Sequence, residues 1–171
     1  DHRELHSFPR RRSSDLELAK YAQGAGFNSL IAMPPHSMKP STQEVENFFT
    51  QLNEAVEIPI WIQNHSAGAP LTAFQLVELC QNIENVSYVK EETVFAGQLT
   101  TSLLEQDNHA VKGVMGGMGC KFLIAEYNRG MCGNMPASHY GDIHSKIWNL
   151  LEQGDEKGAD RKSTRLNSSH W

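Results

Sequence analysis

Val86-Ser87-Tyr88-Val89-Lys90 (VSYVK, residues 86–90) is a short apolar run that ends in a lysine, and the acidic loop Glu91-Glu92-Thr93 follows it. An apolar run of this length predicts a buried β-strand. In barrels of alternating strands and helices, the chemistry of the protein lies where the strands end. Most lysines at such a position are only solvated charges. A role for Lys90 therefore depends on what surrounds this strand.

The strand before Lys90 is one of five similar units along the chain. Hydrophobic patterning predicts strands over residues 28–33, 58–62, 86–90, 110–115 and 131–135, and helices over 41–56, 72–80, 97–106, 121–127 and 142–151. The first two helices begin with Ser or Thr followed three residues later by Glu or Gln, which is the capping-box pattern. Strands that are each followed by a helix are typical of a parallel sheet built from βαβ units.

Two α/β architectures fit this pattern. A doubly wound nucleotide-binding sheet requires a glycine-rich turn after its first strand, whereas residues 116–119 (GGMG) follow the fourth strand and lack the GxGxxG spacing. A (β/α)8 barrel requires eight units and about 250 residues. With five units, we expect an α/β chain that is a fragment of a (β/α)8 TIM barrel, covering about strands 4 to 8. A sheet cut there exposes two long edges and half a core, so the piece should be poorly stable alone.

The two ends of the chain differ in composition from its middle. Six of the seven arginines lie within residues 1–15 and 160–171. Residues 160–170 (DRKSTRLNSSH) back-translate without a mismatch to a common sequencing adapter that begins GATCGGAAGAGC, and residues 6–16 (HSFPRRRSSDL) resemble its partner adapter. We therefore expect residues 1–16 and 160–171 to be adapter-derived, non-native tails and residues 17–159 to form the partial barrel domain. The alternative is a basic tail that binds an acidic partner.

The charge of the interior excludes some classes of partner. Residues 17–159 hold eight basic and sixteen acidic side chains, a formal net charge of −8 against −5 for the whole chain. This balance argues against nucleic acid or an anionic membrane as the partner. No apolar run in this sequence is long enough to span a membrane, and we expect no signal peptide. The three cysteines form no CxxC pair, which favours free thiols in a reducing compartment and predicts a cytoplasmic protein.

Four segments occur in the order and spacing of a known enzyme family. They are residues 18–26 (LAKYAQGAG), the strand that ends at Pro34, residues 59–64 (PIWIQN) and residues 85–91 (NVSYVKE). Through them the chain resembles the dihydrodipicolinate synthase / N-acetylneuraminate lyase family over essentially all of residues 17–159. The resemblance implies the second, C-terminal part of that family's barrel. It also implies that Lys90 is the Schiff-base lysine at the end of the sixth barrel strand.

For such a lysine the resemblance implies imine chemistry. Family members join or split a carbon–carbon bond next to the carbonyl of pyruvate or a related 2-oxo acid. The amine condenses with that carbonyl to an imine, which acts as an electron sink and yields an enamine. The amine must be neutral when it attacks, a state that arginine does not reach. Glu91 and Glu92 would oppose that state if they pointed at the amine, and strand alternation is expected to place Glu91 on the opposite side.

Some positions depart from the family pattern. Gln63 stands where the family usually has a tyrosine that relays protons, and an amide can orient substrate or water but has no useful acid–base chemistry. The loop after Asn64 lacks the arginine with which the synthase type binds its aldehyde substrate, so dihydrodipicolinate synthesis itself is not implied. Pro35 and His36 replace a tyrosine pair, and His36 could supply a titrating group near the site.

The resemblance implies further positions that bind substrate. Asn64 follows Gln63 at the strand end, and Gly116 or Gly117 matches a glycine whose small size leaves room for substrate. Met135 falls where a backbone contact to the oxo acid is expected. The paired threonine hydroxyls that complete the family's site belong to the missing first half. Within residues 17–159, no HxxxH, HExxH or carboxylate cluster suggests a metal, and no cofactor is expected.

These observations lead to two hypotheses for the function. The first is a Schiff-base aldolase or lyase that makes or breaks a carbon–carbon or carbon–oxygen bond next to pyruvate or a related 2-oxo acid, with an aldehyde as the other small-molecule substrate. The second is a non-catalytic barrel homologue that binds a ligand or serves as a scaffold. The resemblance implies a homo-oligomer for the complete protein, and we expect the fragment alone to be inactive.

Overall fold

The computed structural model describes residues 7–35, 40–94, 96–106, 109–136, 138 and 140–169. Within this part of the chain, strands and helices alternate along the middle of the sequence. The strands are β1 (Leu30–Ala32), β2 (Ile60–His65), β3 (Val86–Glu92), β4 (Gly113–Gly116) and β5 (Gly133–Asn134). The helices are α1 (Ser7–Gly24), α2 (Thr42–Ala55), α3 (Ala73–Asn82), α4 (Ala96–Gln106), the 3₁₀ turn η1 (Met118–Cys120), α5 (Leu123–Tyr127), α6 (Gly141–Glu152) and α7 (Glu156–Ser169).

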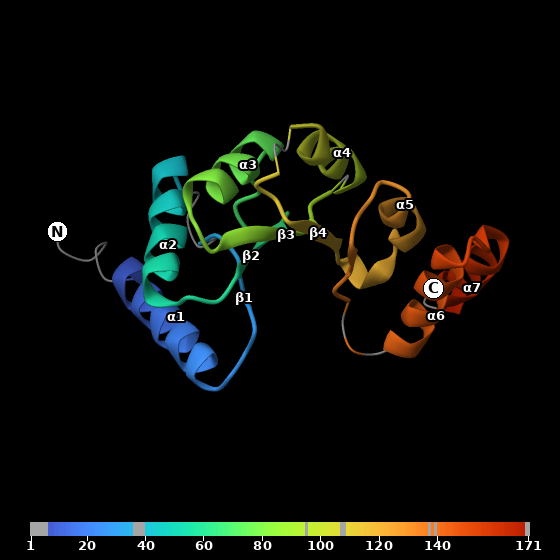
Figure 1. Ribbon diagram of the computed structural model, residues 1–171, viewed down its shortest axis with the longest axis horizontal. Helices are drawn as coiled ribbons and strands as arrows, with labels where there is room; N and C mark the ends of the chain where they lie inside the picture. Colours follow the sequence, from blue (N-terminus) through green and yellow to red (C-terminus); the bar gives the residue numbers. More distant parts are fainter. Residues whose placement is uncertain are drawn as a thin grey trace.

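The five strands form one parallel sheet in the order β1-β2-β3-β4-β5. Each strand therefore pairs with the next one along the chain, as in the wall of a barrel. In a doubly wound sheet, by contrast, the order of the strands reverses at a switch point. Figure 1 shows the helices arranged in an arc on the outside of the sheet. The expected α/β fold, part of a (β/α)8 barrel, is confirmed.

The core lies between the sheet and the helices that cover its outer face. Phe49 of α2, Leu76 of α3 and three strand residues, Ile60, Ile62 and Val89, are fully buried there. The expected helix starts are also present: Ser41 and Glu44 form a capping box before α2, and Thr72 and Gln75 form one before α3. Both boxes satisfy backbone N–H groups that a helix start leaves without partners.

The strand limits differ from the sequence prediction at several ends. β2 begins at Ile60 because Pro59 has no N–H to donate to the ladder, and it continues through Gln63 to His65. The expected strands over residues 28–33 and 131–135 shorten to three and two residues. These short strands are the two edges of the sheet, so the expectation of long exposed edges was wrong. Short edge strands offer few free backbone groups to another chain.

The two predicted tails fall mainly in helices α1 and α7, which continue beyond the predicted domain limits at residues 17 and 159. Ala19 of α1 and Ala159 of α7 are buried. Helical structure does not test the origin of these residues, so the adapter-derived tails remain a prediction. In the described part of the chain, no helix combines the length and apolar character needed to cross a lipid bilayer.

Candidate active site

Lys90 lies near the carboxyl end of β3, in a row of residues that crosses the sheet. The strand register places it beside Gln63 of β2 and Met115 of β4. Two residues earlier on the same strands, and so on the same face, the rings of Trp61 and Tyr88 stack with centroids 4.4 Å apart. The face of the sheet that carries Lys90 therefore combines an aromatic surface with a row of polar and flexible side chains at the strand ends.

Glu92 connects the two residues predicted to be catalytic. Its Oε2 atom lies 3.1 Å from Lys90 Nζ and accepts a hydrogen bond of 2.8 Å from Gln63 Nε2. Its Oε1 atom accepts a hydrogen bond of 3.0 Å from the backbone N–H of Met118. The side chains of Lys90 and Glu92 are only 14% and 9% exposed. Lys90, Gln63 and Glu92 thus form one polar network, which we call the lysine network.

The charge state of Glu92 follows from these contacts. Burial alone would raise its pKa, but the hydrogen bonds from Gln63, Met118 and Lys90, together with the positive charge of Lys90, hold the pKa below its ordinary value. Glu92 is therefore an ionised acceptor at neutral pH. Its Oε2 atom pairs with the Lys90 side chain, so one of the two acidic residues does point at the amine. Glu91, as expected from strand alternation, does not take part in the lysine network.

Gly117 makes room for this carboxylate. A Cβ atom at residue 117 would overlap the Glu92 carboxyl group, so any larger residue would displace it. Sequence reasoning attributed the small size of Gly116 or Gly117 to space for substrate. In the structure the space beside Gly117 holds Glu92, and the space beside Gly116 holds the carboxyl of Glu126. A substrate contact at either glycine remains a prediction.

Asn64 lies on the other face of the sheet from Lys90. It is fully buried, and its Nδ2 donates to Glu91 Oε2 at 2.8 Å and to the Leu71 carbonyl at 3.1 Å. Its Oδ1 accepts from the Leu71 N–H at 2.8 Å. These bonds attach the loop after β2 to β3. The structure therefore gives Asn64 a role in loop anchoring, and its proposed contact with substrate remains untested.

The carboxyl group of Glu91 is buried beside Asn64, on the same outer face of the sheet. Burial raises its pKa, an effect that hydrogen bonds from Thr93 and Asn64 only partly offset. Thr93 donates to Glu91 Oε1 through both its backbone N–H and its hydroxyl. Glu91 thus organises the turn that follows β3, directly after Lys90, and it leaves Glu92 as the carboxylate that faces the amine.

The two remaining predicted substrate-binding residues are Met135 and His36. The backbone N–H of Met135 donates to the carbonyl of Gly116 at 2.8 Å, which joins the end of β5 to the end of β4. That N–H is therefore already engaged, and a contact between Met135 and an oxo acid stays a prediction. His36 lies outside the described residues. The lysine network thus brings together Lys90 and Gln63, whereas Asn64 and Gly116 face the outer side.

Glu92 is the functional candidate that sequence reasoning did not include. The signal was present, because residues 90 and 92 of a strand share a face, and Gln63 stands beside Lys90 in the register. Recognising it required the register between β2 and β3, which the sequence alone does not give. Among the described residues, no group of three or more His, Cys, Asp or Glu side chains is arranged to hold a metal ion.

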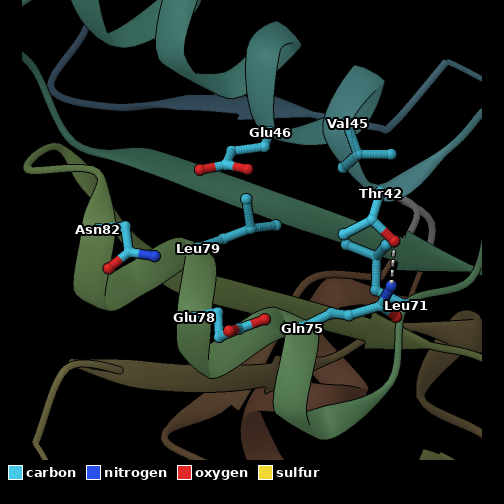
Figure 2. A pocket seen from close by; sticks show the side chains of 8 residues that line it. All are labelled: Thr42, Val45, Glu46, Leu71, Gln75, Glu78, Leu79 and Asn82. Carbon is cyan, nitrogen blue, oxygen red and sulfur yellow. Dashed lines mark hydrogen bonds between the residues drawn. The ribbon is translucent and has the colours of Figure 1, made fainter.

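A surface pocket lies elsewhere, between α2 and α3. Figure 2 shows Gln75 of α3 reaching Thr42 of α2, with Nε2 donating to Oγ1 at 3.1 Å. The carboxylates of Glu46 and Glu78 lie on either side of Leu79, which also lines the pocket. None of the predicted site residues lines this pocket, so it forms no part of the candidate active site.

Comparison with known proteins supports one family. The model of the dihydrodipicolinate synthetase family matches residues 12–168. L-2-keto-3-deoxyarabonate dehydratase from Azospirillum brasilense is 29% identical over 142 residues, which cover 81% of this chain and 46% of that enzyme.

Solved structures agree on the fold. Dihydrodipicolinate synthase from Aquifex aeolicus superposes with a TM-score of 0.82 at 16% identity, covering 92% of this chain and 54% of that one. A prophage protein of the dihydrodipicolinic acid synthase family from E. coli K12, solved in complex with pyruvate, gives a TM-score of 0.79 at 22% identity, covering 91% and 53%. The chain thus spans about half the length of these relatives. It belongs to the dihydrodipicolinate synthetase family.

Proposed function

We propose that the complete protein is a Schiff-base lyase or aldolase in which Lys90 forms an imine with pyruvate or a related 2-oxo acid. The observation that carries this proposal is the position of Lys90 at the end of a central barrel strand, with its Nζ 3.1 Å from Glu92 and its neighbour Gln63 bound to the same carboxylate. A surface lysine would have no such enclosed network. The pyruvate complex of the E. coli relative supports the same class of ligand.

The lysine network suggests how the amine becomes reactive. The ammonium must lose a proton before its nitrogen can add to the carbonyl carbon of the 2-oxo acid, and loss of water then gives the imine. Glu92 Oε2 lies within reach of that proton. Loss of a proton from the carbon next to the imine gives the enamine. In this scheme Glu92 supplies the acid–base group that Gln63 cannot, and Gln63 orients the carboxylate.

A carbon–oxygen lyase deserves equal weight with a carbon–carbon lyase. The long match to a named dehydratase covers most of this chain, and elimination of water from a 2-oxo acid needs an acid–base group close to the imine. Glu92 is such a group. The carbon–carbon route would instead release or consume an aldehyde. The same imine serves both routes, so the structure of the lysine network is compatible with either.

The non-catalytic alternative is not favoured, because the match extends to named enzymes of the family. The remaining partner hypotheses stay as proposed: small-molecule substrates, no nucleic acid, no membrane, and a homo-oligomer for the complete protein. A cytoplasmic location also stays a proposal.

Product analysis tests the proposed function. The complete protein is incubated with a panel of 3-deoxy-2-oxo acids, and products are followed by NMR. Formation of a three-carbon oxo acid plus an aldehyde identifies carbon–carbon cleavage, whereas loss of water without a second carbon product identifies the dehydratase route. Lys90→Arg should abolish either reaction, while Lys112→Arg, at an exposed lysine, should retain it. Activity that survives in Lys90→Arg would overturn the proposal.

A further inference from the structure

Glu126 of α5 is a buried acid that the lysine network does not include. Its side chain is on the outer side of the sheet, and the residue is 1% exposed. Neither carboxyl oxygen has a hydrogen-bond partner among the described residues. An unpaired ionised carboxylate in such a place is costly, because burial removes its water without a replacement. The site is therefore arranged around a group that is more stable when neutral.

The neighbours of Glu126 fit a neutral acid. The Glu126 carboxyl and the Oδ1 atom of Asn134 both lie in the space that a Cβ atom at Gly116 would occupy. As the Asn134 amide is oriented, its oxygen lies on this side and its Nδ2 atom has no hydrogen-bond partner among the described residues. In this orientation a protonated Glu126 can donate to Oδ1, whereas an ionised Glu126 cannot. The Cys120 thiol donates weakly to the same Oδ1 at 3.5 Å. An ionised Glu126 would instead face an oxygen.

The charged and titratable groups around Glu126 also favour its neutral form. Burial, first of all, raises the pKa of Glu126 to about 7, and the charges of Glu91 and Glu92 on β3 add to the rise. A hydrogen bond donated by the Asn134 amide, when its Nδ2 atom faces Glu126, and the charge of Arg129 after α5 only partly offset it. Burial, and then the Glu126 charge, raise the pKa of Cys120 to about 12, so the thiol stays neutral.

Glu126 also lies directly behind residues of the candidate site. Gly116 pairs with Asn134 in the β4–β5 register, and the Gly116 carbonyl accepts from the Met135 N–H. The next residue, Gly117, makes room for Glu92. A change at Glu126 therefore reaches the ends of β4 and β5 through Asn134 and Gly116, without contact with Lys90 itself.

We propose that Glu126 is a positioning residue whose neutral form holds the ends of β4 and β5 in the arrangement that binds the 2-oxo acid. Ionisation of Glu126 places a negative charge against Asn134 Oδ1 and Glu91. Either the Asn134 amide then turns its Nδ2 toward the carboxylate, which ends the Cys120 contact with Oδ1, or β5 shifts, which moves Met135 relative to Gly116. This inference rests on the proposed function, because it assigns Glu126 to the same site. Binding of the oxo acid should therefore weaken as Glu126 loses its proton.

The test measures pyruvate saturation of the borohydride-trapped adduct at pH 6 and pH 8.5, in the complete wild-type protein and in Glu126→Gln. Glutamine stays neutral and can donate to Asn134 Oδ1 at both pH values. The half-saturating pyruvate concentrations should agree at pH 6, whereas at pH 8.5 the variant should need about fivefold less pyruvate than wild type. Comparison within each pH removes the titration of other groups. Glu105→Gln, at an exposed position, should follow wild type.

Two outcomes separate the hypotheses. Adducts in both proteins with the same concentration ratio at pH 6 and pH 8.5 would contradict the role of Glu126 and leave the proposed function standing. No adduct in either protein would contradict the proposed function and this role together. If Glu126→Gln does not fold, Asn134→Ala replaces it. That variant should weaken pyruvate binding at pH 6 and lack the further loss at pH 8.5, and an unchanged loss at pH 8.5 would overturn the inference.

Discussion

The buried acid Glu126 makes a quantitative prediction about stability. In the folded protein its pKa is raised to about 7 from the ordinary 4.5, with burial as the largest cause. The folded state therefore holds this proton more tightly than the unfolded state, so folding loses free energy as the pH rises from about 4.5 through 7. Glutamine at this position does not titrate and is not subject to that loss.

The two pKa values give the size of the effect. Each unit of pKa difference corresponds to about 1.4 kcal/mol. At pH 5 the unfolded carboxyl is already mostly ionised, and the expected cost to folding is about 0.8 kcal/mol. At pH 8 both states are ionised, and the cost approaches about 3.3 kcal/mol. The stability of Glu126→Gln relative to wild type should therefore increase by about 2.5 kcal/mol between pH 5 and pH 8.

Urea unfolding of the complete protein at the two pH values measures this difference directly. Wild type, Glu126→Gln and the exposed control Glu105→Gln are compared at each pH, so that titration of all other groups cancels. The control should show a constant difference from wild type. A relative stability of Glu126→Gln that changes by less than about 0.5 kcal/mol would show that Glu126 is ionised or solvated in the folded protein, and the reasoning on its neutral form would fail.

Three further substitutions test separate features. Glu92→Gln should lower kcat by about a hundredfold because it removes the proton acceptor beside Lys90, and steady-state rates equal to wild type would remove Glu92 from the mechanism. Phe49→Ala should reduce the unfolding free energy by about 3–5 kcal/mol, because Phe49 is fully buried in the core; a loss below about 1 kcal/mol in chemical denaturation would contradict that packing. Thr72→Ala should cost about 1 kcal/mol by removing the cap of α3, and unchanged stability in the same assay would show that the cap contributes nothing.

The order of strands and helices could be read from the sequence because each element carries a local signal. Ser41 and Thr72 begin helices through bonds within three residues, and the apolar strands alternate with helices at regular spacing. The edge strands were less predictable. Only three residues of β1 pair with β2 and only two of β5 pair with β4, and the extent of this pairing depends on the neighbouring strand as well as on residues 28–33 or 131–135.

The candidate site was predictable only in part, for a related reason. Lys90 stands at a predicted strand end, but the choice of Lys90 and Gln63 as catalytic residues came from the family resemblance. The strand register places the two residues side by side. The role of Glu92 depends on which strand lies beside it and on the absence of a side chain at Gly117. Likewise, Asn64 and Gly116 share their strands with Gln63 and Met115 but face the helices. One residue of register decides between the two faces.

The central claim is that the amine of Lys90 forms an imine with a 2-oxo acid, and peptide mapping after borohydride reduction tests it most directly. The complete protein is treated with pyruvate and borohydride, digested and analysed by mass spectrometry, with Lys112→Arg and Lys90→Arg as matched variants. Our account predicts a reduced pyruvate adduct on the peptide that contains Lys90, present in Lys112→Arg and absent in Lys90→Arg. An unmodified Lys90 across pyruvate and other 2-oxo acids would contradict it.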